Sequence, residues 1–208
     1  MKKKFIDFIT TPPIFTTQLY IMALFDQHFE NIDFSSTPLP SNDFEDCTFS
    51  YCNFSNVNLS NVKFTHCQFI ECNLSLANIN GTAFRQVAFD HCKMLGLKFE
   101  NANAMGLQMN FQQCNLTHTS FFQVALKKCV FKGCKLTEVD FTEGDFSQSV
   151  FQECDCSGAI FYQTNLEQAD FRTSIRFSIH PERNKIKKAK FSKTELEGLL
   201  DQYGILIE

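Results

Sequence analysis

Large apolar residues recur at every fifth position over most of this chain, from about Phe44 to Phe171. A small residue lies two positions before each large one, and Ser or Thr often follows it, as in Cys47-Thr48-Phe49-Ser50 and Val57-Asn58-Leu59-Ser60. Helices repeat every 3.6 residues and strands every 2, so a period of five fits neither. The pattern therefore indicates an internal repeat rather than a succession of ordinary helices and strands.

The large apolar residue is the centre of each repeat, and the centres form two runs. The first run is Phe44, Phe49, Phe54, Leu59, Phe64, Phe69, Leu74, Ile79, Phe84, Phe89, Met94, Phe99 and Ala104. The second run is Phe111, Leu116, Phe121, Leu126, Phe131, Leu136, Phe141, Phe146, Phe151, Cys156, Phe161, Leu166 and Phe171. The step between the runs is seven residues instead of five, which predicts one break in register between residues 105 and 110.

Like residues also recur at a spacing of twenty. The columns with this spacing include Phe111, Phe131, Phe151 and Phe171, and also Phe49, Phe69 and Phe89. Four repeats would therefore close one coil, so that like side chains stack between successive coils and build a continuous core. The 26 centres predict about six and a half coils. At about 4.8 Å per coil, the rod would be about 31 Å long.

The repeat pattern divides the chain into three segments. Residues 1–28 are expected to form an N-terminal extension, residues 29–177 the solenoid, and residues 178–208 a last partial coil, a short helix and a terminal strand. Met1 and Met22 are both possible starts of the natural chain. The first 25 residues contain three lysines and an apolar stretch but no A-x-A cleavage site, which favours an extension over a secretory signal.

The carboxyl tail changes character after the last coil. Ser192 and Glu195 have the spacing of a capping box, which predicts a short helix that Gly204 ends. An open solenoid end needs a cover, so one interpretation is that the tail caps the rod. The other interpretation is dimerisation through the tail. The residues expected to cap the end or to form a dimer contact are Leu196, Leu199, Leu200, Ile205, Leu206 and Ile207.

Composition narrows the class of protein further. Phe occurs 25 times and Trp never, as expected when one repeat position demands one shape. No run of eighteen apolar residues is present, so no membrane span is expected. Nine of the ten cysteines occupy the small position of a repeat and Cys156 is a centre, so we expect buried packing residues in a reducing cytoplasm rather than a metal site. A spacing of about 4.8 Å leaves disulfides between stacked cysteines sterically possible, but Val and Ala in the same position favour free thiols.

The five-residue pattern resembles that of the pentapeptide-repeat family, whose consensus is A-(D/N)-(L/F)-x-x. The resemblance covers about residues 29–192, with copies such as Cys114-Asn115-Leu116-Thr117 and Ala169-Asp170-Phe171. It implies an all-β fold, a right-handed quadrilateral parallel β-helix in which the centre and the small residue both point inward. The period of twenty in the sequence agrees with four such repeats per coil.

No arrangement of residues indicates catalysis or a bound cofactor. His66, His91 and His118 each lie two residues after a centre and should point outward. Motifs of nucleophilic, phosphate-binding or metal-dependent enzymes are absent from the sequence. A core filled with Phe also leaves no interior pocket. We therefore expect a protein that is not an enzyme and has no cofactor and no catalytic or metal site.

Charge is the remaining signal. The chain has a net charge of −4, but residues 136–171 contain eight acids and no base. These acids, the predicted partner-binding acidic face, are Glu138, Asp140, Glu143, Asp145, Glu153, Asp155, Glu167 and Asp170. A basic tail follows, with Arg183, Lys185, Lys187, Lys188, Lys190 and Lys193. One interpretation is that outward positions must simply be polar; the other is that a narrow acidic rod imitates DNA, which carries one charge per ~1.7 Å.

The resemblance suggests a partner for such a rod. Qnr-type and MfpA-type members of the family bind DNA gyrase or topoisomerase IV, protect it from quinolones and dimerise through their carboxyl ends. Qnr proteins of Gram-negative bacteria carry two long loops, whereas this chain has only the interruption at residues 37–41 and the insertion near Gly106, so no loop residue is carried over. The expected function is a cytoplasmic homodimer that binds a type II topoisomerase, with no direct contact to nucleic acid or membrane. The alternative is a rigid scaffold for another protein.

Overall fold

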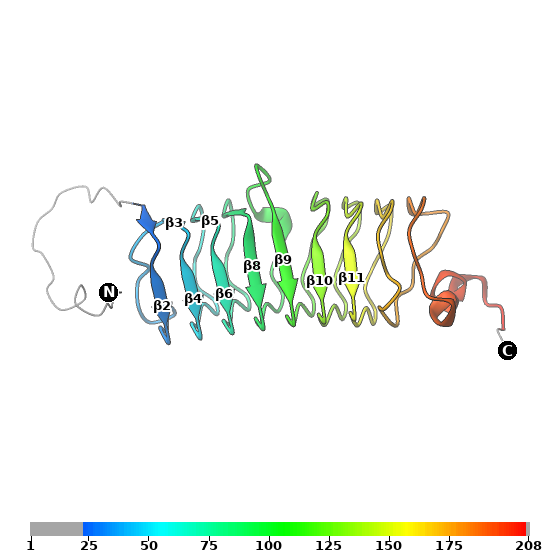
Figure 1. Ribbon diagram of the computed structural model, residues 1–208, viewed down its shortest axis with the longest axis horizontal. Helices are drawn as coiled ribbons and strands as arrows, with labels where there is room; N and C mark the ends of the chain where they lie inside the picture. The colour runs from blue at the N-terminus through cyan, green and yellow to red at the C-terminus, as the bar shows by residue number, and fades with distance from the viewer. Residues whose placement is uncertain (1–22, 207–208) are drawn as a thin grey trace, which may run out of the picture.

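The protein is a straight rod of stacked coils, as the computed structural model shows for residues 23–206 (Figure 1). All strands pair in parallel with the strand one coil away. The described residues contain strands, turns and short 3₁₀-helices but no α-helix. The predicted all-β solenoid is therefore confirmed, while the expected extension over residues 1–28 lies mostly outside the described residues.

Two walls of the rod are regular parallel sheets. The seven-stranded sheet contains β2 (His28–Glu30), β4 (Thr48–Ser50), β6 (Gln68–Ile70), β8 (Val87–Asp90), β9 (Met109–Gln112), β10 (Val130–Lys132) and β11 (Val150–Gln152). The four-stranded sheet contains β1 (Leu24–Phe25), β3 (Asp43–Glu45), β5 (Lys63–Thr65) and β7 (Ala83–Arg85). Because β1 pairs with β3, the first coil begins at Leu24, before the expected boundary at residue 29.

The rod has four faces, which we number in chain order from the seven-stranded sheet. Face 1 is that sheet, with Phe131 in its column of centres. Face 2 carries the column of Leu136, and face 3 the column of Phe141; both are held by isolated parallel bridges such as Asn53–Asn73 and Asn58–Asn78. Face 4 is the four-stranded sheet and its continuation beside Phe146. Four five-residue repeats thus make one coil, as the period of twenty predicted.

The core is a set of stacked aromatic columns. Phe111 and Phe131 stack with ring centroids 5.0 Å apart and an angle of 6° between their planes. Within a coil the rings meet edge to face instead, as Phe141 and Phe146 do at 4.9 Å and 88°. Both arrangements suit the charge distribution of an aromatic ring, and they fill the interior densely. The ten cysteines are all free and buried, which confirms their predicted place in the core.

The predicted register break is confirmed between the 3₁₀-helix η2 (Phe99–Asn101) and β9. Phe89 pairs with Phe111, a step of 22 residues, whereas the steps before and after it are 20. Ala104 was expected to be a buried centre and is exposed instead, because the inserted residues leave the wall as a projecting loop (Figure 1). Gly106 allows the loop to turn with a φ of +73°.

The carboxyl end closes with two 3₁₀-helices, η3 (Lys193–Leu199) and η4 (Asp201–Tyr203), in place of one regular helix. Ser192 caps η3 by accepting a hydrogen bond from the Thr194 amide at 3.2 Å. The capping box is incomplete, because the Glu195 carboxylate accepts from the Arg176 amide at 3.5 Å. Glu195 also has non-helical backbone angles, which breaks the helix into short turns.

The η3 helix occupies the end of the solenoid. The Gly198 carbonyl accepts a hydrogen bond from the Ile179 amide at 2.8 Å, so the tail caps the last coil. Ile205 and Leu206 do not form the expected strand: both are exposed and have no regular secondary structure after Gly204 ends η4. Ile207 lies outside the described residues. Gly204 ends η4 in the left-handed conformation, as predicted.

Candidate interaction surface

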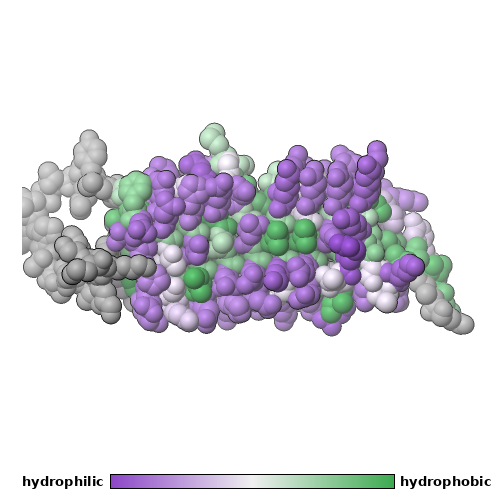
Figure 2. Space-filling view, in the orientation of Figure 1, coloured by the Kyte–Doolittle hydropathy of each residue, from purple (hydrophilic) through white to green (hydrophobic). Residues whose placement is uncertain are grey.

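Within residues 23–206 the interior holds packed apolar side chains and no charged one, so the charged groups lie on the outside of the rod. Face 1 carries a shallow groove, lined among others by Ile70, Ala88, Asn110 and Val130. Figure 2 shows apolar side chains along the middle of the rod between two rows of hydrophilic ones. Asp90 and Lys132 border the groove without converging on a point. The groove therefore lacks the paired titratable groups that catalysis needs.

Corner positions of the coil carry many of the outward charges. Glu138, Glu143 and Glu153 all have φ between 53° and 57°, the left-handed conformation that turns the chain from one face to the next. This conformation is uncommon for residues other than Gly, and the stacked backbone hydrogen bonds above and below hold it in place. The three glutamates are consequently fixed at the edges of the rod.

The predicted acidic face is not one face. Asp140 lies on face 3 and Asp145 on face 4, whereas Asp155 lies on face 2 and Asp170 on face 1. Glu153 occupies the corner between faces 1 and 2, and Glu167 lies on face 4 one coil beyond Asp145. The eight acids therefore surround the rod, and the structure brings only some of them together.

Three of the four aspartates are paired with bases from outside residues 136–171. Asp145 lies 3.2 Å from the Lys127 ammonium, and Asp170 lies 2.7 Å from the Arg172 guanidinium and 3.8 Å from Lys190. Asp155 accepts a hydrogen bond from Arg176 at 2.9 Å. The hydrogen bonds from Arg176 and Arg172 lower the pKa values of Asp155 and Asp170 below the usual range. Three of the eight negative charges seen in the sequence are thus neutralised locally.

Three carboxylates without a Lys or Arg partner remain together in one coil. Glu138 lies at the corner before face 3, Asp140 on face 3, and Glu143 at the corner after it. Their contacts are with other groups: Glu138 is 3.2 Å from the His118 imidazole, and Glu143 accepts from the Gln123 amide at 2.8 Å. Asp140 accepts from the backbone amide of Thr142 at 2.8 Å. These contacts orient the carboxylates, and none of them is to a Lys or Arg side chain.

Two large apolar side chains extend this group on the same face. Ile160 lies one coil beyond Asp140 and is 51% exposed, and Tyr162 is 42% exposed. The Tyr162 carbonyl accepts from the Glu143 amide at 2.8 Å, which fixes the two coils against each other. We call Glu138, Asp140, Glu143, Ile160 and Tyr162 the face-3 patch. Sequence reasoning missed Ile160 and Tyr162, although both flank the centre Phe161 at outward positions where polar residues are usual.

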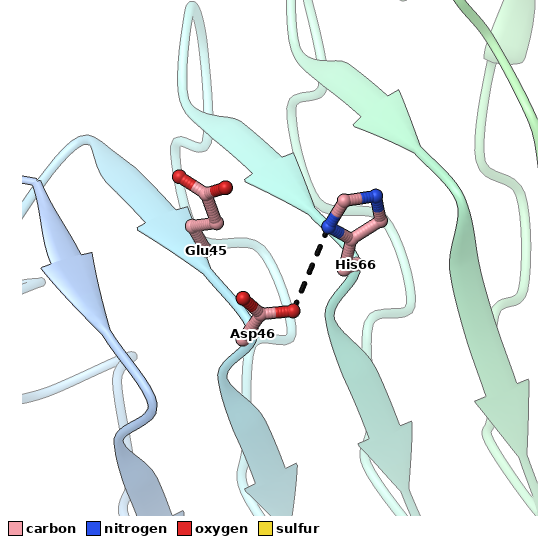
Figure 3. Close-up of side chains that lie close together, drawn as sticks. All are labelled: Glu45, Asp46 and His66. Carbon is pink, nitrogen blue, oxygen red and sulfur yellow. Dashed lines mark ion pairs between the residues drawn. The ribbon is translucent and has the colours of Figure 1, made fainter.

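A second cluster of titratable groups lies near the N-terminal end, where Glu45, Asp46 and His66 have ligand atoms within 4.8 Å of one another. Figure 3 shows the Asp46 carboxylate beside the His66 imidazole, with the Glu45 carboxylate pointing away from that pair. The Asp46 and His66 atoms are 3.5 Å apart and both side chains are largely exposed. An exposed ion pair between neighbouring coils accounts for this arrangement, and we assign no metal to it.

The carboxyl end carries the remaining exposed groups that the sequence singled out. Leu196, Ile205 and Leu206 are exposed, with Leu206 at 92%, whereas Leu199 packs against the core and Leu200 is half-buried. Lys185, Lys187 and Lys188 are exposed on the last coil. Among residues 23–206 no helix has the length and apolar character needed to cross a bilayer.

Comparison with known proteins identifies the family. The model of the pentapeptide repeat region matches residues 62–133, 104–175 and 124–199. It describes a repeat and indicates no catalytic family. None of the curated proteins matched the chain in sequence.

Solved structures resemble the whole rod. A trypsin-treated variant of QnrB1, described as a plasmid-mediated fluoroquinolone resistance protein, aligns with a TM-score of 0.60 at 19% identity, covering 88% of this chain and 99% of its own. A second trypsin-treated variant aligns with a TM-score of 0.59 at 19% identity, covering 90% and 100%. At this identity the likeness concerns the fold alone. The family match extends over well more than half of the sequence, and the chain belongs to the pentapeptide-repeat family.

Proposed function

We propose that this protein is a non-enzymatic, cytoplasmic binding partner of a type II topoisomerase, DNA gyrase or topoisomerase IV. The observation that carries the proposal is the face-3 patch, where Glu138, Asp140 and Glu143 project from one coil without a Lys or Arg partner. These enzymes bind DNA on basic surfaces, and unpaired carboxylates on a narrow rod present a partial imitation of the DNA charge. Binding there would compete with DNA and so protect the enzyme from quinolones.

Charge complementarity determines which carboxylates attract the enzyme and how the binding depends on salt. Paired carboxylates such as Asp155 contribute little to attraction at a distance, because the Arg176 charge cancels theirs. Attraction to a basic channel therefore depends on the face-3 patch rather than on all eight acids. Such an interaction steers association, and it weakens as salt screens the charges. The described fluoroquinolone resistance of QnrB1 agrees with this choice of partner, but the proposal depends on the charges of this chain.

The apolar half of the same patch favours a second candidate, a rigid scaffold for a different protein. Exposed Ile160 and Tyr162 have no counterpart in the phosphate backbone of DNA. Aromatic and aliphatic side chains among charged ones are typical of protein interfaces. On this alternative the carboxylates set orientation, and the apolar side chains provide most of the affinity.

The carboxyl end is the proposed homodimer contact. Leu196 in η3 and Ile205 and Leu206 after η4 are all exposed, although the hydrogen bond at Gly198 already closes the cap. Because the cap does not bury them, they remain available to a second copy. Burial of such side chains between two copies stabilises the dimer by about 25 cal/mol per Å² of apolar surface.

A binding experiment with two matched triple variants tests the topoisomerase proposal. The first variant carries Glu138→Lys, Asp140→Lys and Glu143→Lys; the control carries Glu30→Lys, Glu45→Lys and Asp46→Lys, an equal change of charge at the other end of the rod. Surface plasmon resonance with immobilised DNA gyrase measures both at about 50 and 200 mM salt. We expect wild-type binding to weaken with salt, the face-3 variant to lose at least about tenfold in affinity, and the control to stay within about twofold.

Equal losses in both triple variants would contradict the face-3 patch as the binding site. Absence of gyrase and topoisomerase IV binding by the wild type at low salt would contradict the proposal as a whole. A pull-down dominated by another protein that tolerates the three lysine substitutions but not Tyr162→Ala would support the scaffold instead.

A further inference from the structure

Six cysteines form one continuous column inside the corner between faces 1 and 2. They occupy the same repeat position in successive coils, and none is more than 2% exposed. The column consists of Cys52, Cys72, Cys92, Cys114, Cys134 and Cys154. Successive coils of a parallel sheet are about 4.8 Å apart, so the six sulfur atoms extend over about 24 Å. No part of the proposed topoisomerase contact uses them.

Each thiol in the column has two kinds of neighbour. The first is the carbonyl oxygen of a face-1 centre in the preceding coil: Cys92 donates to the Phe69 oxygen at 3.3 Å and Cys154 to the Phe131 oxygen at 3.4 Å. The second is the thiol one coil away, because parallel pairing places equivalent residues of successive coils about 4.8 Å apart. Ser174 continues the position after Cys154, with its hydroxyl donating to the Phe151 oxygen at 2.6 Å.

This geometry offers two sulfur ligands to an ion, but not three or four. A straight column brings each thiol close to one above and one below, and within residues 23–206 no three thiols lie within 4.8 Å of one another. Tetrahedral ions such as Zn²⁺ need four converging ligands and are therefore excluded from the column. A soft ion that prefers two opposed thiolates fits midway between two neighbouring sulfurs.

The surroundings of the cysteine column favour a metal–thiolate complex without net charge. Carbonyl oxygens and Phe rings line the corner, and neither stabilises a negative ion. Burial likewise raises the pKa values of Cys129 and Cys156, which lie elsewhere in the same core. A monovalent ion held by two thiolates would leave a net negative charge there, whereas a divalent ion would leave none. Burial of an uncompensated charge is costly.

We propose that this column is a binding site for soft divalent d¹⁰ ions with two opposed ligands, of which the mercuric ion is the type. Binding replaces two protons and leaves a neutral product: Hg²⁺ + 2 RSH → Hg(SR)₂ + 2 H⁺, with no oxidation or reduction. Six thiols taken in pairs hold at most three ions. Cys47 and Cys67, which lie one coil apart at the corner between faces 4 and 1, hold one more. The rod would thus sequester four ions.

Substitution by Ser provides a matched test, because Ser149 and Ser174 already occupy this repeat position and donate to carbonyl oxygens. Cys72→Ser interrupts the column and leaves Cys52 without a partner, so one pair is lost. Cys129→Ser is the control, since Cys129 is equally buried but lies outside the column. Both variants should keep the wild-type circular dichroism spectrum.

Reduced protein is incubated with HgCl₂. A wash with a dilute monothiol then removes ions that are held by only one sulfur. Elemental mass spectrometry measures the number of mercury ions that remain per chain. We expect four for the wild type and for Cys129→Ser and three for Cys72→Ser, with two protons released per ion and an unchanged circular dichroism spectrum. X-ray absorption should show two sulfur neighbours. Equal ion content in wild type and Cys72→Ser, loss of the fold on binding, or nitrogen and oxygen neighbours would each overturn the proposal.

Discussion

Phe141 shows how a single side chain is held in this core. Its ring stacks between those of Phe121 and Phe161, at 5.5 and 4.9 Å, and meets Phe146 edge to face. The side chain is fully buried. This environment was predictable, because like residues recur at twenty positions and a coil of four repeats must then stack them. The angles between the rings were not predictable from spacing alone, because they depend on how neighbouring columns pack.

Phe141→Ala should lower the free energy of unfolding by about 3–5 kcal/mol, because it opens a cavity that stacked neighbours cannot fill. Urea denaturation followed by circular dichroism measures the loss. Phe25→Ala, at a 55% exposed position in β1, is the control and should lose much less. A loss below about 1 kcal/mol for Phe141→Ala would contradict the stacked column.

Cys156 occupies a repeat centre, where burial raises its pKa to about 12 from an ordinary value of 9.0. Its folded-state pKa is therefore above the unfolded one, so its contribution to stability is complete below pH 9 and is lost as the pH rises toward 12. The loss is at most about 1.4 kcal/mol per pH unit. Unfolding of Cys156→Val, measured at pH 8 and pH 10.5, should show a smaller alkaline loss than the wild type. Equal losses would contradict the raised pKa.

At the scale of elements, the regular repeats were easier to predict from the sequence than the inserted loop and the carboxyl tail. The two-residue insertion was evident from the step between Phe99 and Phe111, but the exposure of Ala104 was not, because a projecting loop and a buried repeat both satisfy that spacing. The tail was expected to be a helix and a strand. Contact with Phe177 and Ile179 instead selects 3₁₀ turns, and such tertiary contacts leave no periodic signal in a short segment.

The cap depends on Gly198, which has no room for a side chain. A Cβ there would collide with the Phe177 carbonyl oxygen and lie 2.8 Å from its ring. Gly198→Ala should therefore displace η3 and expose the last coil. Hydrogen exchange should become at least about tenfold faster at residues 177–179 and unchanged in β4–β6, whereas Leu196→Ala, at an exposed position of the same helix, should leave both unchanged. Unaltered exchange in Gly198→Ala would contradict the cap.

For the whole molecule, the sequence showed the amount of charge but not its arrangement. Eight acids without an intervening base suggested one acidic face, yet the coil distributes them over four faces. Three of the aspartates are also paired with basic side chains, which are Lys127, Arg172, Arg176 and Lys190. The sequence did indicate two of these pairs by their spacing. Lys190 follows Asp170 by twenty residues, and Arg176 follows Asp155 by 21. Exact pairing depends on side-chain reach, which spacing does not give. The result is a smaller candidate site with a clearer boundary.

The proposed dimer makes a prediction at this same scale. Leu206→Asp should shift the protein from dimer to monomer in sedimentation equilibrium, because it places a charge in an apolar contact. Leu76→Asp is the matched control, since Leu76 is 63% exposed on the wall of the rod and far from the carboxyl end in sequence. A wild-type monomer, or dimers in both variants, would contradict the carboxyl-terminal contact.

The central functional claim is that the face-3 patch binds a type II topoisomerase and protects it. The most direct measurement is DNA supercoiling by gyrase with and without a quinolone, in the presence of the wild type or of the variant with lysines at Glu138, Asp140 and Glu143. We predict that the wild type restores supercoiling under the quinolone and that the variant does not. Failure of the wild type to restore it, or equal restoration by the variant, would contradict the account.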